Sequence, residues 1–119
     1  MTSKRLRLVI FQEEPGLWTV RGLEHDVSAE ARTIGGAIRA AVQFVDAHTA
    51  VDIRHDHLPL SAIPPAPQKY WNAYASGTAV PLTVGAPIGW DIQAAFATRV
   101  PVDSYPSRPT GALRFQDAR

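Results

Sequence analysis

The order of patterns in the first 48 residues constrains the fold most, because three strand-like runs lead directly into one amphipathic helix. Residues 5–11 (RLRLVIF) alternate between two faces with the period of two that a strand requires. Leu6, Leu8 and Ile10 share one face. The other face carries Arg5 and Arg7 at its start and Val9 and Phe11 at its end. Pro15-Gly16 suits a tight turn. We therefore expect a hairpin with a return strand over residues 17–24, a bend near residues 25–26 and a third strand over residues 27–32.

A helix is predicted to follow the third strand. Thr33 is a suitable N-cap, since its hydroxyl can accept a hydrogen bond from an amide of the first helical turn. The apolar residues after it recur at helical spacing and form one stripe: Ile34, Ile38, Val42 and Val45. This stripe predicts a helix that runs to about His48. The pair Gly35-Gly36 would let the start of that helix approach a strand closely.

The second half of the chain has a different composition, because nine of the ten prolines lie from Pro59 onward. Proline excludes long helices and central strands there. We expect a connector over residues 58–67, a short helix from Pro67 to about Ser76 and a short strand over residues 80–84. Residues 91–99 are predicted to form a helix, with a strand as the alternative. The tail from Pro101 carries further Pro and Gly with scattered Arg and is expected to be flexible.

Together these patterns predict an α+β fold with a three- or four-stranded antiparallel sheet, one main helix and a Pro-rich segment that contains short helices. The predicted organisation is a β-β-β-α core over residues 1–58, a Pro-rich extension over residues 59–100 and a tail over residues 101–119. The extension is expected to pack on the core or on a second subunit.

Charge and composition narrow the classes of function. The 119 residues suit one domain, and 12 Lys and Arg against 11 Asp and Glu give a net charge of +1. This balance lacks the basic excess that is typical of a dedicated nucleic-acid-binding protein. The absence of Cys excludes disulfides and thiolate chemistry. The N-terminus does not resemble a signal peptide and no apolar run reaches transmembrane length, so we expect a cytoplasmic protein that does not bind membranes.

A resemblance to a known family covers the segment from Leu6 to His48. The first strand LRLVIFQEE, the turn PG, the return strand LWTVRGLE, the run HDVSAEA and the helix TIGGAIRAAVQFVDA resemble the HicB antitoxin family and its stand-alone partial relatives. The resemblance implies a small α+β unit with a helix across one face of the sheet. Members of that family bind and neutralise a small RNA-cleaving toxin, HicA, and often repress their own operon through a C-terminal DNA-binding domain.

Two departures from the family pattern limit what the resemblance implies. The Pro-rich second half resembles neither a helix-turn-helix nor a ribbon-helix-helix module, so the repressor role is not carried over. Ile34-Gly35-Gly36 replaces the polar, helix-forming residues that follow the Thr in the family.

The implied function is a non-enzymatic, homo-oligomeric protein that binds a protein partner such as a HicA-like toxin. No catalytic residue and no cofactor are predicted. The residues expected to contact a partner are basic or aromatic: Arg5, Arg7, Tyr70, Trp71, Tyr74 and Trp90.

Two polar clusters support an alternative function. Residues 52–57 (DIRHDH) gather two Asp and two His, and His55 and His57 are weak candidates for metal ligands. Glu24, His25 and Asp26 would form an acid–base pair if they faced a cleft. The alternative is a small nucleic-acid-binding or hydrolytic module in which the two clusters converge. Nucleic-acid binding by the basic residues of the first strand is less favoured, because the total charge is near neutral.

Overall fold

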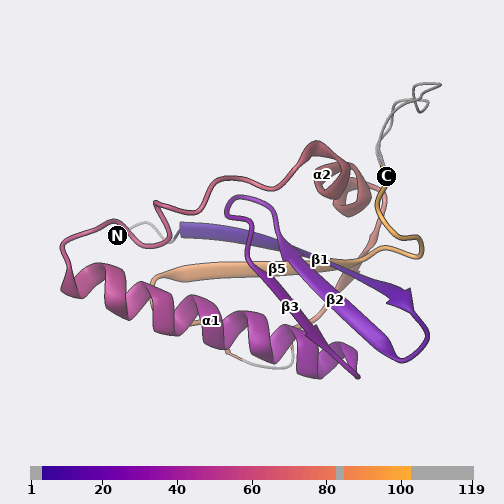
Figure 1. The fold of residues 1–119 in the computed structure, drawn as a ribbon, viewed down its shortest axis with the longest axis horizontal. Coiled ribbons are helices and arrows are strands. Elements are labelled where there is room, and N and C mark those ends of the chain that lie inside the picture. Colours follow the sequence, from indigo (N-terminus) through magenta and orange to yellow (C-terminus); the bar gives the residue numbers. More distant parts are fainter. Residues whose placement is uncertain (1–3, 83–84, 103–119) are drawn as a thin grey trace, which may run out of the picture.

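The computed structural model describes residues 4–82 and 85–102, and these residues form an α+β fold with a five-stranded mixed sheet and two helices (Figure 1). The strand order in the sheet is β3-β2-β1-β5-β4. The elements follow the chain as β1 (Lys4–Glu14), β2 (Leu17–Gly22), β3 (Ser28–Ala31), α1 (Ile34–Arg54), α2 (Gln68–Ala75), β4 (Thr78–Val80) and β5 (Trp90–Phe96).

The three strands predicted in the N-terminal segment are present, as part of a larger mixed sheet. β1 and β2 pair antiparallel across the turn at residues 15–16, where Gly16 has a φ of +80°. This φ favours glycine, because a side chain is strained in that conformation. β2 then pairs antiparallel with β3, with Val20 opposite Ala29.

The predicted helix start is confirmed, and the predicted end is wrong. The Thr33 hydroxyl accepts a hydrogen bond from the Gly36 amide at 3.0 Å. A Cβ at position 36 would lie 3.2 Å from the Cβ of Ala31, so the helix start does approach β3 closely. α1 continues past His48 to Arg54 because residues in its last turns have tertiary partners: Thr49 bonds Trp90, and Asp52 bonds the loop at Leu60.

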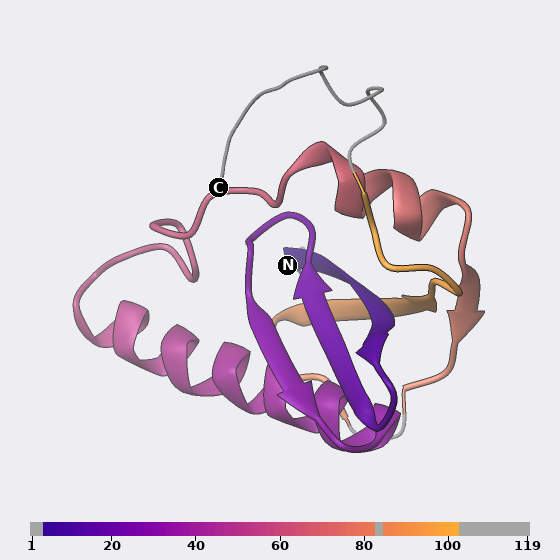
Figure 2. The ribbon, with the colours of Figure 1, turned by 45° about the vertical axis from the view of Figure 1, so that its right-hand side comes forward.

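The two helices lie on opposite faces of the sheet (Figures 1 and 2). Leu6, Leu8 and Ile10 point to the α1 face and share a fully buried core with Ile38 and Val45 of that helix. The alternate β1 residues Val9 and Phe11 point to the other face, where they pack with Tyr70 of α2. The alternation predicted for the first strand is therefore confirmed, and its apolar end is covered by α2.

The sheet differs from the prediction in size and direction. Residues 90–96 form strand β5 and not a helix; β5 pairs parallel with β1 and antiparallel with β4. The sheet therefore has five strands in a mixed arrangement, where three or four antiparallel strands were predicted. The strand alternative for this segment is confirmed. Pairing on both sides, with Ile92 and Ala94 buried against the α1 face, overrides the weak strand preference of Gln and Ala.

The Pro-rich half contributes to the same sheet as the N-terminal half, since β5 lies between β1 and β4. The short helix predicted from Pro67 to Ser76 is confirmed as α2, with Pro67 immediately before its first residue. The strand predicted over residues 80–84 begins earlier, as β4; residues 83–84 lie outside the described part of the chain, as does most of the predicted tail, residues 103–119. None of the helices described here has the length and hydrophobicity needed to cross a membrane.

Candidate functional site

Arg7 lies at the centre of a mixed aromatic and charged cluster on the α2 face of the sheet. Its backbone amide donates to Glu24 Oε1 at 2.7 Å, and its Nε donates to Glu24 Oε2 at 2.6 Å. The guanidinium carbon lies 5.0 Å from the ring centroid of Trp71 and 5.9 Å from that of Tyr74, within the range of cation–π attraction. We call Arg7, Glu24, Trp71 and Tyr74 the Arg7 cluster. Its ion pair is about a quarter exposed (29% for Arg7 and 21% for Glu24), and both aromatic rings are partly exposed.

Tyr70 anchors α2 to the sheet beside the Arg7 cluster. Its hydroxyl accepts a hydrogen bond from Arg21 Nη1 at 2.8 Å, and the Arg21 guanidinium carbon lies 4.2 Å from its ring centroid. Arg21 also donates through Nε and Nη2 to the two carboxylate oxygens of Asp26, at 2.8 and 2.7 Å. Tyr70 is buried and stacks on Phe11. It therefore positions α2 and offers little surface to a partner.

The structure separates the other two predicted contact residues from this cluster. Trp90 is buried on the α1 face, and its Nε1 donates to the Thr49 hydroxyl at 3.0 Å. Arg5 is exposed, and it lies opposite Asp91 in the pairing of β1 with β5. Of the six predicted residues, three come together, because the Arg7 guanidinium lies over the rings of Trp71 and Tyr74. Tyr70 belongs to the buried cluster against which Trp71 and Tyr74 pack.

Glu24, His25 and Asp26 do not form an acid–base group, because each side chain has a different partner. Glu24 binds Arg7 and Asp26 binds Arg21. The Nδ1 of His25 lies 2.9 Å from the backbone carbonyl of Ile63, to which it donates when protonated at that position. Through these bonds, the bend after β2 is attached to three elements. Glu24 binds β1, Asp26 binds β2 and His25 contacts the connector before α2.

Asp52 is the best-connected carboxylate in the 52–57 cluster, and its role is structural. Its Oδ2 accepts from the Leu60 amide at 2.7 Å and lies 2.9 Å from His48 Nδ1. The hydrogen bond from the Leu60 amide lowers the pKa of Asp52, against the opposing effect of burial and with help from His48. Leu60 is fully buried and has a φ of +60°, so Asp52 secures a strained turn.

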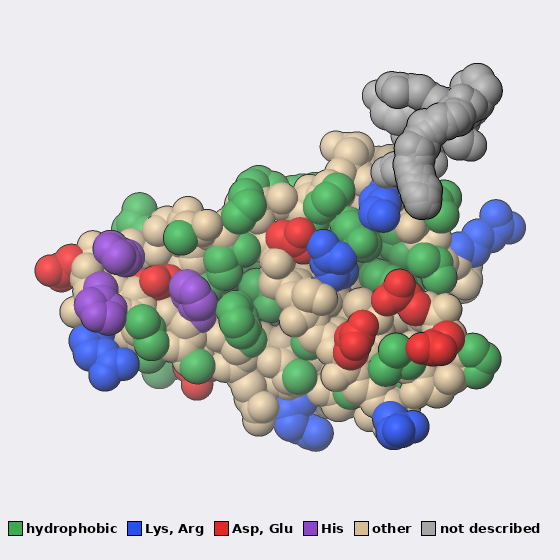
Figure 3. Space-filling view, in the orientation of Figure 1, with side chains coloured by type: hydrophobic (Ala, Val, Ile, Leu, Met, Phe, Trp, Pro, Cys, Tyr) green, Lys and Arg blue, Asp and Glu red, His purple; other side chains and the backbone are tan. Residues whose placement is uncertain are grey.

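His55 and His57 lie at the exposed end of α1, where Figure 3 shows histidines gathered together. Their ring centroids are 6.2 Å apart. Within residues 4–82 and 85–102, no three His, Cys, Asp or Glu side chains are arranged to hold a metal ion. The two histidines therefore lack the further ligand that a protein metal site requires among these residues.

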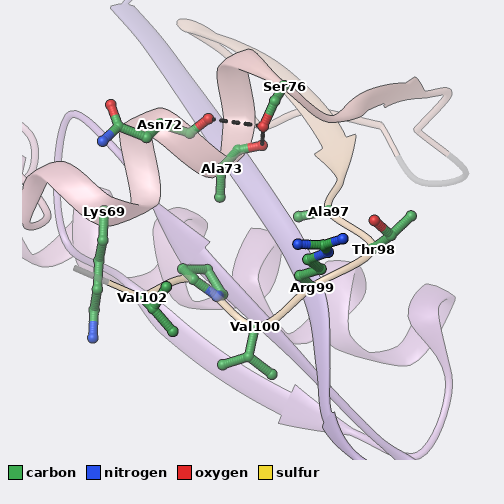
Figure 4. A pocket seen from close by; sticks show the side chains of 10 residues that line it. Lys69, Asn72, Ala73, Ser76, Ala97, Thr98, Arg99, Val100 and Val102 are labelled. Atoms are coloured by element: carbon green, nitrogen blue, oxygen red, sulfur yellow. Dashed lines mark hydrogen bonds between the residues drawn. The ribbon is translucent and has the colours of Figure 1, made fainter. Parts of the chain in front are cut away.

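A groove of about 410 Å³ lies between α2 and the segment after β5 (Figure 4). We call it the α2 groove. One wall consists of residues at helical spacing on α2, and the other of residues 97–102. The lining residues are Lys69, Asn72, Ala73, Ser76, Ala97, Thr98, Arg99, Val100, Pro101 and Val102. No local sequence pattern indicates that residues 97–102 lie opposite α2.

The outer side of α1 carries a second apolar surface, in addition to the face that packs on the sheet. Phe44 and Val51 are each 42% exposed. With Ala47 and His48 they line a shallow depression of about 250 Å³. The residues Ala40, Phe44, Ala47 and Val51 follow one another at spacings of four and three. We call these four residues the α1 outer stripe.

The chain matches no known protein-family model, and comparisons with curated proteins and with solved structures found no similar protein.

Proposed function

We propose that this chain is a non-enzymatic interaction protein of the HicB type that binds a protein partner through the Arg7 cluster. The proposal is supported by the β-β-β-α order of the segment that resembles HicB, with its helix packed across one face of the sheet. It is supported further by Glu24, Asp26 and Asp52 of the polar candidate clusters, whose carboxylates are engaged in structural hydrogen bonds.

The observation that carries the proposal is the composition and geometry of the Arg7 cluster. Arg, Trp and Tyr contribute most often to the binding energy of protein interfaces. Glu24 and the two rings hold the Arg7 guanidinium in place, so little side-chain freedom remains to be lost on binding. Trp71 is fixed as well, since its Nε1 donates to the backbone carbonyl of Ala66 at 3.0 Å. The cluster is a pre-organised, partly exposed surface that suits a protein partner.

The partner that the resemblance suggests is a small HicA-like toxin. The tagged chain is expressed in its own cells, and proteins that copurify in stoichiometric amount are identified by mass spectrometry. We expect Trp71→Ala to weaken binding of that partner by about 30-fold or more, as truncation of a central aromatic contact does. Ile88→Ala removes a fully exposed apolar side chain elsewhere and serves as the control. Equal recovery of the partner with wild type and Trp71→Ala, both folded by circular dichroism, would contradict the proposed site.

We also propose that the chain self-associates through the α1 outer stripe, with a second copy of the same stripe as the partner. The alternation of small and large side chains at spacings of four and three is the pattern with which paired helices interdigitate. The stripe contains no charged residue, so two copies can meet without burying an unpaired charge. Its location on the opposite side of the sheet from α2 leaves the Arg7 cluster accessible in such a dimer.

A further inference from the structure

The geometry points to the α2 groove as a docking site for an extended, acidic segment of a protein partner, with apolar side chains among its carboxylates. This inference rests on the proposed function, because it assumes a protein partner, and it names the chemistry of the segment that the partner would supply.

The charge of the groove favours carboxylates. Lys69 and Arg99 come from opposite walls, and none of the lining residues is acidic (Figure 4). Neither cation forms an ion pair with any residue among 4–82 and 85–102. This contrasts with Arg7 and Arg21, whose charges are compensated by Glu24 and Asp26. Two cations in one groove, neither with an ion-pair partner in the described part of the chain, attract an acidic ligand and repel a basic one.

The wall formed by residues 97–102 suits an extended peptide. The backbone of residues 98–102 makes no hydrogen bond to any other described residue. Its carbonyls, and its amides except at Pro101, which has no N–H, can therefore pair with an added strand. Val100 and Val102 are 39% and 72% exposed on the same segment. A peptide beside this wall would place apolar side chains on the valines and carboxylates near the cations.

The lining argues against a nucleic acid as the ligand. Single-stranded nucleic acids are held by aromatic side chains on which the bases stack, together with basic groups. None of the ten lining residues is aromatic. The Tyr70 ring lies 5.2 Å from the Nζ of Lys69, but it is buried and therefore not open to a stacking base. The groove thus offers an ion-pairing and apolar surface without a stacking platform.

The experiment measures binding of a fluorescein-labelled peptide that alternates Glu with Leu to the full chain, by fluorescence anisotropy. We expect Lys69→Ala and Arg99→Ala each to weaken binding about threefold to fivefold, as the loss of an exposed ion pair does. The double variant Lys69→Glu/Arg99→Glu is expected to abolish binding. Arg32→Glu/Arg39→Glu changes the net charge equally at exposed positions away from the groove, and is expected to retain wild-type affinity.

Three results would overturn the inference. The first is equal loss of binding in both double variants, which would show that only net charge matters. The second is equally tight binding of a labelled thymidine oligonucleotide, which would show an unspecific anion site. The third is no peptide binding by wild type; a lowered thermal midpoint of the Ala variants would then show that the cations pair within the chain. Copurification of a partner that depends on Trp71 is scored separately, so failure of the groove and failure of the proposed function are distinguishable.

Discussion

At the scale of single residues, Asp52 shows how a candidate catalytic group serves the fold. One carboxylate oxygen accepts from the Leu60 amide and contacts His48, one turn earlier on α1. The backbone carbonyl of Asp52 accepts from the His57 amide at 2.7 Å. Asp52 thus bonds the backbone just after the C-terminal end of α1 through its carbonyl, and its carboxylate fixes the loop that brings Leu60 into the core.

The lowered pKa of Asp52 predicts a specific pH dependence of stability. The folded state favours the ionised carboxylate, so the stabilisation is complete above the unfolded-state pKa of about 4. It is lost as the pH falls through the lower pKa of the folded state. We expect the midpoint of thermal unfolding to fall more steeply between about pH 5 and pH 3 in wild type than in Asp52→Asn. Asp46→Asn, an exposed change on the same helix, is the control, and parallel curves for wild type and Asp52→Asn would contradict this role.

At the scale of elements, α1 carries two apolar faces, and only one of them is covered by the sheet. The covered face holds Ile38 and Val45, which are almost completely buried. The uncovered face is the α1 outer stripe. A helix that needed only to close this core would present polar residues outward.

The proposed self-association predicts different outcomes for two neighbouring substitutions on α1. Phe44→Asp places a charge in the centre of the outer stripe, so we expect a monomer by light scattering at concentrations where wild type is dimeric. Gln43→Asp adds the same charge at an exposed neighbouring position outside the stripe and should leave the dimer intact. Since Phe44 is 42% exposed, its substitution is expected to cost about 1 kcal/mol or less in monomer stability. A Phe44→Asp protein with the mass of wild type would exclude this interface.

At the scale of the whole molecule, the sheet joins the two ends of the described chain. β1 pairs with β5 over the full length of β5, from Lys4 opposite Trp90 to Ile10 opposite Phe96. Trp90, Ile92 and Ala94 complete the core that Leu6 and Leu8 share with α1. The N-terminal meander and its helix therefore depend on a strand from the Pro-rich half.

This dependence predicts that residues 1–58 do not fold alone. Without β5 the polar backbone of β1 loses its partner on one side, and buried side chains of the sheet become exposed. We expect the 1–58 fragment to show no cooperative thermal unfolding by circular dichroism, and residues 1–102 to show a sigmoidal transition. A cooperative transition in the short fragment would mean that the N-terminal unit is independently stable.

The parts of the fold that local patterns determine could be predicted from the sequence, and the parts that distant pairing determines could not. The alternation in residues 5–11 and the hydroxyl of Thr33 act over a few residues, and the structure follows them. In β5, Ile92 and Phe96 occur at a helical spacing, and only the flanking strands β1 and β4 make the segment extended. The same distinction between local patterns and distant contacts applies to the candidate site. The aromatic residues of α2 were visible as a group, whereas their contact with Arg7 and the approach of Arg99 to α2 depend on the tertiary fold.

The pairing of β1 with β5 has a consequence for synthesis of the chain. β1 is made before β5, and its partner follows 86 residues later, counted from Lys4 to Trp90. At about 5–20 residues per second, β1 waits roughly 4–17 s with one edge unpaired. Open strand edges recruit other strands, so the nascent chain passes through a period in which chaperones or a preformed partner would have the greatest effect on its yield.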